Sequence, residues 1–275
     1  MENSITSQLK TGTLNLLCGG PSAGKTTLIY QAICAHERKE PFFVESLSFP
    51  AGPVLVVSTD RNRTINSAMF TAFGIQQTEF ISVVDDLKLH TLSKPLKDEA
   101  YGMEQFRAEI TNRILKLPFH PSTIILDLYG DFISSKSSNL KALAYDGRTN
   151  VRWAEQLKTA ILGITYPYKQ KATNYALRIQ DRMAGGLSLQ ASANWKFNIS
   201  DRAETKTCWI IDAVPPPMGG PPKTYYAMRQ DDSSGIGLFV PCEPPYDADD
   251  TATITERYGV SDRQARNILK RMRDE

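Results

Sequence analysis

Residues 19–26, Gly-Gly-Pro-Ser-Ala-Gly-Lys-Thr, constrain the fold of this chain more than any other feature. They match the pattern G-x-x-x-x-G-K-[ST], which requires a buried strand before it and a helix after it. The apolar run at residues 13–18 comes directly before them, and residues 25–38 have the length and apolar spacing of a helix. The motif in this setting predicts a strand, a glycine-rich loop and a helix, with backbone N–H groups that enclose a phosphate chain.

The predicted nucleotide-binding residues are Gly19, Gly20, Pro21, Ser22, Ala23, Gly24, Lys25, Thr26 and Thr27. Glycine is needed because the backbone must approach the phosphates, and a Cβ at Gly24 would crowd them. We expect the Lys25 ammonium on the β and γ phosphates and the Thr26 hydroxyl on Mg²⁺. Asp127 ends a buried apolar run, where its carboxylate can hold the same ion through water; the alternative is an aspartate that caps a turn. The expected cofactors are therefore ATP and Mg²⁺.

Short apolar runs alternate with segments of helical period in the first part of the chain. We expect strands at residues 13–18, 54–58, 80–84, 123–127 and 160–165, and helices at residues 25–38, 62–73, 101–117 and 150–159. Strands rich in Val, Ile and Leu between helices predict an α/β fold with a mostly parallel central sheet, covered on both faces. Beyond residue 190, four short strands without intervening helices predict an antiparallel C-terminal extension, in which the Pro-rich residues 215–222 connect two strands as a hairpin.

Composition excludes several classes of protein. No apolar run approaches the ~20 residues of a membrane helix, and the N-terminal residues lack the apolar core of a signal peptide. The four cysteines lie far apart without metal-ligand spacing, so reduced thiols in a cytoplasmic protein are expected. A net charge of +2 is too balanced to indicate nucleic-acid binding, so any basic surface must be local.

The motif, Asp127 and the order of elements resemble the RecA/DnaB superfamily of P-loop ATPases, in particular RepA-type hexameric helicases and small phage RecA-like proteins. The resemblance spans roughly residues 10–240 and implies a RecA-like core that assembles as a homo-oligomer, either a ring, as in the hexamers, or a filament. It also implies a bacterial, plasmid or phage origin. It implies that Asp60, one methylene shorter than the usual Glu, polarises the attacking water. It also implies a trans-acting cation from the adjacent subunit, for which Arg202 and Lys206 are the candidates.

Two long loops occupy the positions at which this family holds single-stranded DNA. The first is the Ser-rich segment at residues 134–150. The second, at residues 169–186, contains an aromatic residue on which a base can stack and four cations, Lys169, Lys171, Arg178 and Arg182. Cations that follow a phosphate backbone, interleaved with an aromatic, are typical of binding without sequence preference. A solvated surface loop is the alternative.

The last thirty residues indicate a separate element after a Pro- and Asp-rich boundary. We therefore divide the chain into an ATPase domain at residues 1–243 and a helix-turn-helix-like tail at residues 247–275. Ser261 is a natural N-cap for a helix over residues 262–273, which carries Arg263, Arg266 and Lys270 and is able to enter the groove of duplex DNA. The alternative is an amphipathic tail that docks on the ATPase core or on a neighbouring subunit.

These features together predict an ATP-hydrolysing motor that handles single-stranded DNA, either a RepA-like replicative helicase or a small RecA-like recombinase. Two other interpretations stay open. The protein could be a RecA-fold regulatory ATPase that switches protein partners, or a helix-turn-helix DNA-binding regulator that senses nucleotide. The sequence predicts no membrane partner.

Overall fold

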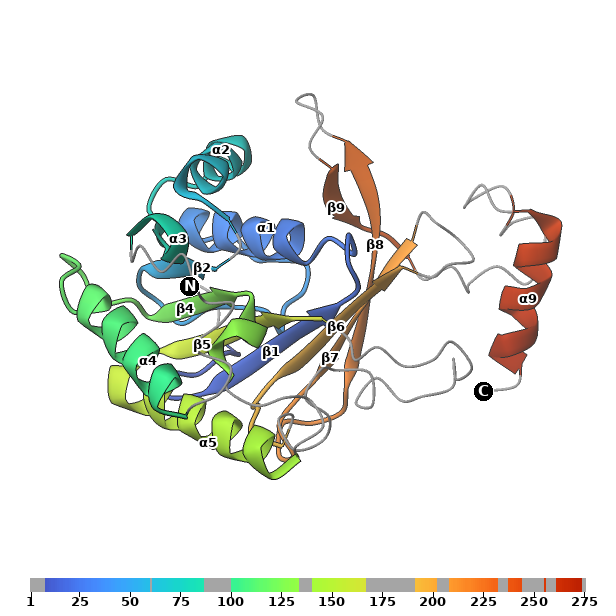
Figure 1. Ribbon diagram of the computed structural model, residues 1–275. Coiled ribbons are helices and arrows are strands. Elements are labelled where there is room, and N and C mark those ends of the chain that lie inside the picture. The colour runs from blue at the N-terminus through green and yellow to red at the C-terminus, as the bar shows by residue number, and fades with distance from the viewer. Residues whose placement is uncertain are drawn as a thin grey trace, which may run out of the picture.

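The computed structural model describes residues 8–59, 61–86, 100–133, 140–166, 191–201, 208–231, 237–243, 255 and 261–273. Within these ranges the chain forms a nine-stranded sheet flanked by helices (Figure 1). No helix in the same ranges is both long enough and apolar enough to cross a membrane.

The strand order of the sheet is β3-β2-β4-β5-β1-β6-β7-β8-β9. Strands β1 to β6 pair in parallel, and β6 to β9 pair antiparallel. Their bounds are β1 Leu14–Gly19, β2 Val54–Ser58, β3 Glu79–Ser82, β4 Thr123–Asp127, β5 Ala160–Thr165, β6 Lys196–Asp201, β7 Cys208–Val214, β8 Lys223–Asp231 and β9 Gly237–Pro241. The predicted α/β class, with a mostly parallel sheet and an antiparallel extension, is confirmed.

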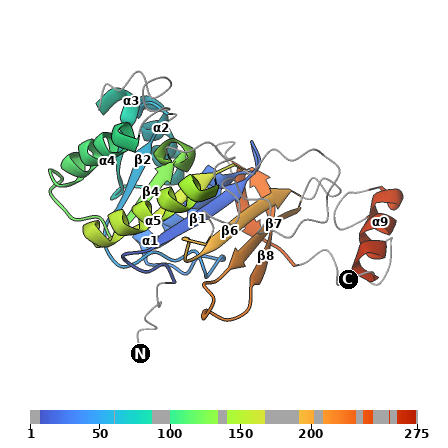
Figure 2. The ribbon, with the colours of Figure 1, turned by 60° about the horizontal axis from the view of Figure 1, so that its bottom comes forward.

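Helices cover both faces of the parallel part of the sheet (Figures 1 and 2). Successive residues of β1 face opposite sides of the sheet: Leu17 packs into the core beneath α1 and α2, whereas Leu16 packs into the core beneath α4 and α5. The helices are α1 Lys25–Arg38, α2 Arg63–Phe73, α3 Val83–Asp86, α4 Ala100–Ile114, α5 Leu140–Leu157 and α9 Asp262–Arg273, with a 3₁₀ turn, η1, at Tyr129–Phe132.

The strand expected at residues 80–84 ends earlier than predicted. Strand β3 stops at Ser82, and the short helix α3 begins at Val83. The Ser82 hydroxyl accepts the Asp85 N–H at 3.3 Å, and the Asp86 carboxylate accepts the Ser82 N–H at 2.9 Å. This reciprocal capping begins a helical turn where the apolar pattern alone favoured continued strand.

Helix α5 begins ten residues before its predicted start, so residues 140–150 of the expected DNA-binding loop are helical, which corrects that prediction. The buried face of α5 contains the polar residues Asp146 and Asn150, which obscured the helical pattern in the sequence. Arg107 of α4 is the polar partner of both residues: its Nε donates to Asn150 Oδ1 at 3.0 Å, and its Nη2 lies 3.8 Å from Asp146 Oδ1. Burial lowers the pKa of Arg107, while the Asp146 carboxylate opposes that effect.

The segment at residues 215–222 joins the antiparallel neighbours β7 and β8, so the predicted hairpin is confirmed. In the tail, α9 has the predicted bounds. Ser261 caps it reciprocally: the Gln264 N–H donates to Ser261 Oγ at 3.4 Å, and the Ser261 N–H donates to Gln264 Oε1 at 2.9 Å. The first helix of the expected helix-turn-helix falls largely outside the described residues.

Candidate nucleotide-binding site

The glycine-rich loop turns sharply between β1 and α1. Gly24 is the N-cap of α1 and has φ +85°, and its carbonyl accepts the Leu28 N–H at 2.9 Å as the helix begins. Earlier in the loop, the Ala23 N–H donates to the Gly20 carbonyl at 3.2 Å. The first turn of a helix leaves its N–H groups without partners inside the helix, so this end of α1 favours an anion.

Lys25 lies folded over the loop that precedes it. Its Nζ donates to the carbonyls of Gly19 and Gly20, both at 2.8 Å, and lies 4.2 Å from the centroid of the Tyr166 ring. Tyr166 directly follows β5, so the aromatic ring reaches Lys25 from a neighbouring strand. The lysine is 7% exposed, which places its charge at the wall of a pocket rather than in bulk solvent.

A cavity of about 390 Å³ opens in front of the loop. It is lined by Ser22, Gly24, Lys25, Thr26, Thr27, Arg61, Asp127, Leu128, Tyr166 and Arg229. The lining contains three cationic side chains, Lys25, Arg61 and Arg229, against one carboxylate, Asp127. This excess of positive charge, added to the field of the α1 N-terminus, suits a polyphosphate anion.

Thr26 and Asp127, the two expected Mg²⁺ ligands, converge on a single cationic group. Arg61 Nη2 donates to Thr26 Oγ1 at 2.9 Å, and Arg61 Nη1 lies 3.3 Å from Asp127 Oδ2. A hydroxyl from α1 and a carboxylate from β4 therefore already face one position that favours positive charge. Mg²⁺ is commonly held by one or two protein oxygens together with substrate phosphates, so these residues fit the ion.

Residues far apart in the sequence close the site, and sequence reasoning missed them. A Cβ on Gly24 would overlap Phe239 Cζ, so the Phe239 ring of β9 lies directly against the loop. Gln31 of α1 holds Phe239 in place, since its side chain accepts the Phe239 N–H at 2.9 Å and donates to the Phe239 carbonyl at 3.0 Å. Arg229 comes from the adjacent strand β8. No local signal marks these contacts.

Arg61, by contrast, has a signal that sequence reasoning could have used. Ligands of open α/β sheets bind beyond the carboxyl ends of the strands, and Arg61 follows β2 closely, as Tyr166 follows β5. Hydrogen bonds also connect the residues that follow β2 to those at the end of β4. The Thr59 N–H donates to the Asp127 carbonyl at 2.7 Å, and Thr59 Oγ1 donates to Asp131 Oδ2 at 2.6 Å.

Several predicted site residues lie outside the described ranges: Asp60, Lys169, Lys171, Arg178, Arg182, Arg202 and Lys206. The structure therefore places neither the expected water-polarising carboxylate, nor the second DNA loop, nor the trans cations. In the tail, Arg263 is exposed, and Arg266 pairs with Asp262 one turn earlier at 2.8 Å. Lys270 lies on α9, but its side chain is not among those described.

Comparisons with known proteins show the family to which this chain belongs. The sequence matches the AAA domain family over residues 3–172, a span that contains the loop, Arg61 and Asp127. The fold is similar to the crystal structure of the RadB recombinase, with a TM-score of 0.49 and 11% identity over 81% of this chain and 89% of that chain. No curated protein matches the sequence significantly. Because the family match covers more than half of the chain, this protein belongs to the AAA domain family.

Proposed function

We propose that the protein hydrolyses ATP in this cavity and uses the cycle to move or reorganise single-stranded DNA. The observation that carries the nucleotide part is the convergence of Lys25, Thr26 and Asp127 on one cationic cavity at the N-terminus of α1. In the proposal, Lys25 neutralises the β and γ phosphates, while Thr26 and Asp127 hold Mg²⁺. When bound, the metal ion would offset negative charge on the phosphate oxygens.

The residue that polarises the attacking water is proposed to be Asp60. Asp60 is the neighbour in the sequence of Arg61, which lines the cavity, and this adjacency supports the assignment. A shorter Asp in place of the usual Glu predicts modest turnover. In the same proposal, Arg202 or Lys206 of a neighbouring subunit completes the site in a ring or filament.

The DNA part of the proposal rests on charge. The cluster Lys169, Lys171, Arg178 and Arg182 comes soon after β5, which borders the cavity through Tyr166. Because this cluster is close in the sequence to a residue that lines the cavity, we propose that its contact with DNA depends on the bound nucleotide. A helicase and a recombinase both need to bind single-stranded DNA in a way that depends on nucleotide, so we propose one of these two roles.

The test is ATP hydrolysis by the purified full chain, with and without single-stranded DNA. Lys25→Ala should reduce hydrolysis on the order of 10²-fold or more, since no equivalent charge replaces the ammonium in the transition state. Asp127→Asn should remove Mg²⁺-dependent turnover while leaving the circular dichroism spectrum unchanged. Lys116→Ala, at an exposed lysine after α4, is the matched control. Wild-type rates in either site variant would reject the assignment.

One observation favours a second candidate function, a duplex-binding regulator that senses nucleotide. Helix α9 starts with a reciprocal cap and exposes Arg263 and Arg266, as a helix that enters a DNA groove requires. Strong stimulation of hydrolysis by single strands favours the motor. Duplex binding without such stimulation favours the regulator.

A further inference from the structure

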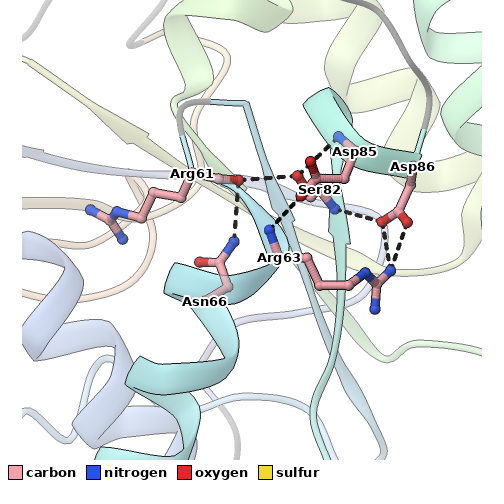
Figure 3. Close-up of polar contacts among 6 residues, drawn as sticks. All are labelled: Arg61, Arg63, Asn66, Ser82, Asp85 and Asp86. Atoms are coloured by element: carbon pink, nitrogen blue, oxygen red, sulfur yellow. Dashed lines mark hydrogen bonds and ion pairs between the residues drawn. The ribbon is translucent and has the colours of Figure 1, made fainter.

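The backbone of Arg61 is anchored on both sides, which fixes the direction of its side chain. Its N–H donates to Ser58 Oγ at 3.2 Å. Its carbonyl accepts the Ser82 hydroxyl at 3.1 Å and, at 3.5 Å, the Asn66 amide. Figure 3 shows the Arg61 side chain pointing away from Ser82 and Asp85, whereas Arg63 reaches back to Asp86. The β2–α2 connection therefore directs one arginine into the cavity and the other away from it.

The Arg61 guanidinium joins two elements that the nucleotide site needs together. It donates to Thr26 Oγ1 on α1 at 2.9 Å and lies 3.3 Å from Asp127 Oδ2 at the end of β4. The Asp127 side chain is 4% exposed and that of Arg61 is 24% exposed. A carboxylate this buried is stabilised by a nearby cation, and the Arg61 guanidinium supplies positive charge beside Asp127.

The same two oxygens are the ones assigned to the metal ion. Mg²⁺ binds oxygen at about 2.0–2.1 Å and demands near-octahedral geometry. The Arg61 guanidinium uses a lone pair of the Thr26 hydroxyl and, through its ion pair with Asp127, places like charge at that position. Arg61 and a divalent cation therefore exclude one another from Thr26 and Asp127.

We propose that Arg61 is the resident cation of the metal position and is exchanged for Mg²⁺ when the metal–nucleotide complex binds. This inference rests on the proposed nucleotide site and adds a form of regulation to it. Arg61 thus acts as a positioning residue that holds Thr26 and Asp127 until the metal ion takes its place.

The proposal predicts opposite effects of one substitution under two conditions. Without metal, Arg61 screens the Asp127 carboxylate from the phosphates, so its removal should weaken nucleotide binding. With metal, Arg61 competes for Thr26 and Asp127, so its removal should lower the Mg²⁺ concentration needed for binding. A residue with only a structural role would weaken binding under both conditions.

The experiment measures binding of a fluorescent, non-hydrolysable ATP analogue to the full chain, first in EDTA and then across a Mg²⁺ titration. Arg61→Gln should lower the half-saturating Mg²⁺ concentration roughly tenfold and weaken metal-free binding by a similar factor, the scale of one charge-assisted hydrogen bond. The half-saturating Mg²⁺ concentration of Arg61→Lys should lie between those of the wild type and Arg61→Gln. A single ammonium group cannot contact both Thr26 Oγ1 and Asp127 Oδ2 as the guanidinium does. Arg63→Gln is the matched control, since Arg63 pairs with Asp86 outside the cavity and should behave as wild type.

The outcomes separate the cation exchange from the nucleotide site on which it rests. If folded Arg61→Gln has the same half-saturating Mg²⁺ concentration as the wild type, the exchange is overturned and the nucleotide site is unaffected. Arg61→Lys gives the same test if Arg61→Gln does not fold. Weaker binding in both EDTA and Mg²⁺ overturns the exchange as well. Failure of the wild-type protein to bind the analogue under any condition overturns the proposed function, and the exchange with it.

Discussion

At the scale of single residues, the phosphate loop is shaped by contacts from both ends of the chain. The phosphate-binding motif requires glycine at position 24 because a Cβ there would crowd the phosphates. The structure adds two reasons: its φ of +85° and the Phe239 ring, which occupies the space that a side chain would need. The glycine is thus required by the folded protein itself, before any nucleotide is bound.

Gly24→Ala should therefore destabilise the protein as well as impair binding. A left-handed backbone costs a non-glycine residue about 1–2 kcal/mol, and overpacking against Phe239 adds about 1–3 kcal/mol. Thermal unfolding should show a lower Tm for Gly24→Ala. Gly20→Ala adds the same methyl group where nothing lies within 4 Å, so its Tm should be unchanged. Adding Phe239→Leu to Gly24→Ala should restore part of the stability, and an unaltered Tm in Gly24→Ala alone would contradict the structural role of this glycine.

At the scale of elements, a buried polar network joins α4, α5 and the η1 turn that follows Asp127. Asn150 donates to the Tyr129 hydroxyl at 2.7 Å, and Arg107 Nη2 donates to the Phe132 carbonyl at 3.1 Å. Tyr129 also packs against Gly163, where a Cβ would lie 2.6 Å from its ring. The network fixes the η1 turn that follows Asp127 in the sequence, and so helps to hold Asp127 at the end of β4 in place.

Tyr129 makes this network sensitive to high pH. Burial raises the pKa of its hydroxyl well above the ordinary value, against smaller opposing effects of the Asn150 hydrogen bond and Arg107. In the unfolded chain the hydroxyl ionises near pH 10, so above that pH the unfolded state loses a proton that the folded state retains. Stability should therefore fall as the pH rises above about 10.

Tyr129→Phe should show a smaller alkaline decrease in unfolding free energy than the wild type between about pH 8 and pH 10.5, measured by urea denaturation. At about pH 8 the variant should be about 1 kcal/mol less stable, because the buried Asn150 amide is left without this acceptor. Tyr145→Phe, at a half-exposed tyrosine, is the control and should follow the wild-type profile. Identical alkaline slopes for wild type and Tyr129→Phe would show that the network does not depend on the neutral hydroxyl.

At the scale of the whole molecule, the ATPase body and the basic tail lie in different places. In both ribbon views α9 stands beside the antiparallel half of the sheet, at a distance from α1 and the phosphate loop (Figures 1 and 2). Within α9, Ala265 is fully buried while Arg263 and Arg266 are exposed. The proposed DNA contact of the tail can therefore be tested separately from the one proposed for residues 169–186.

Neutralising Lys169, Lys171, Arg178 and Arg182 together should remove most DNA-stimulated ATP hydrolysis. It should also reduce the salt slope of single-strand binding by about 0.7 for each phosphate that the protein no longer neutralises. Deletion of residues 247–275 should leave the stimulation intact and lower duplex affinity. If stimulation instead survives the neutralisation and disappears with the deletion, the tail is the main DNA-binding element. Filter binding across a salt series and steady-state hydrolysis provide both readouts.

The sequence by itself determined the features that depend on neighbouring residues. The apolar runs of β2, β4 and β5 and the helical period of α1 and α9 have the bounds that were predicted. The glycine-rich motif located the phosphate loop, and the position of Asp127 at a strand end brought it into the cavity. In these cases periodicity and spacing along the chain are enough, because the physical cause acts within a few residues.

The tertiary structure decided whatever depends on contacts between distant residues. The start of α5 was missed because Asp146 and Asn150 are tolerated in its buried face only through Arg107 of α4. Phe239 closes the loop at Gly24, and Arg61 joins Thr26 to Asp127, through pairings that no local pattern encodes. Burial and charge compensation are properties of the packed molecule, so the polar residues of this site acquire their partners only when the sheet brings its strand ends together.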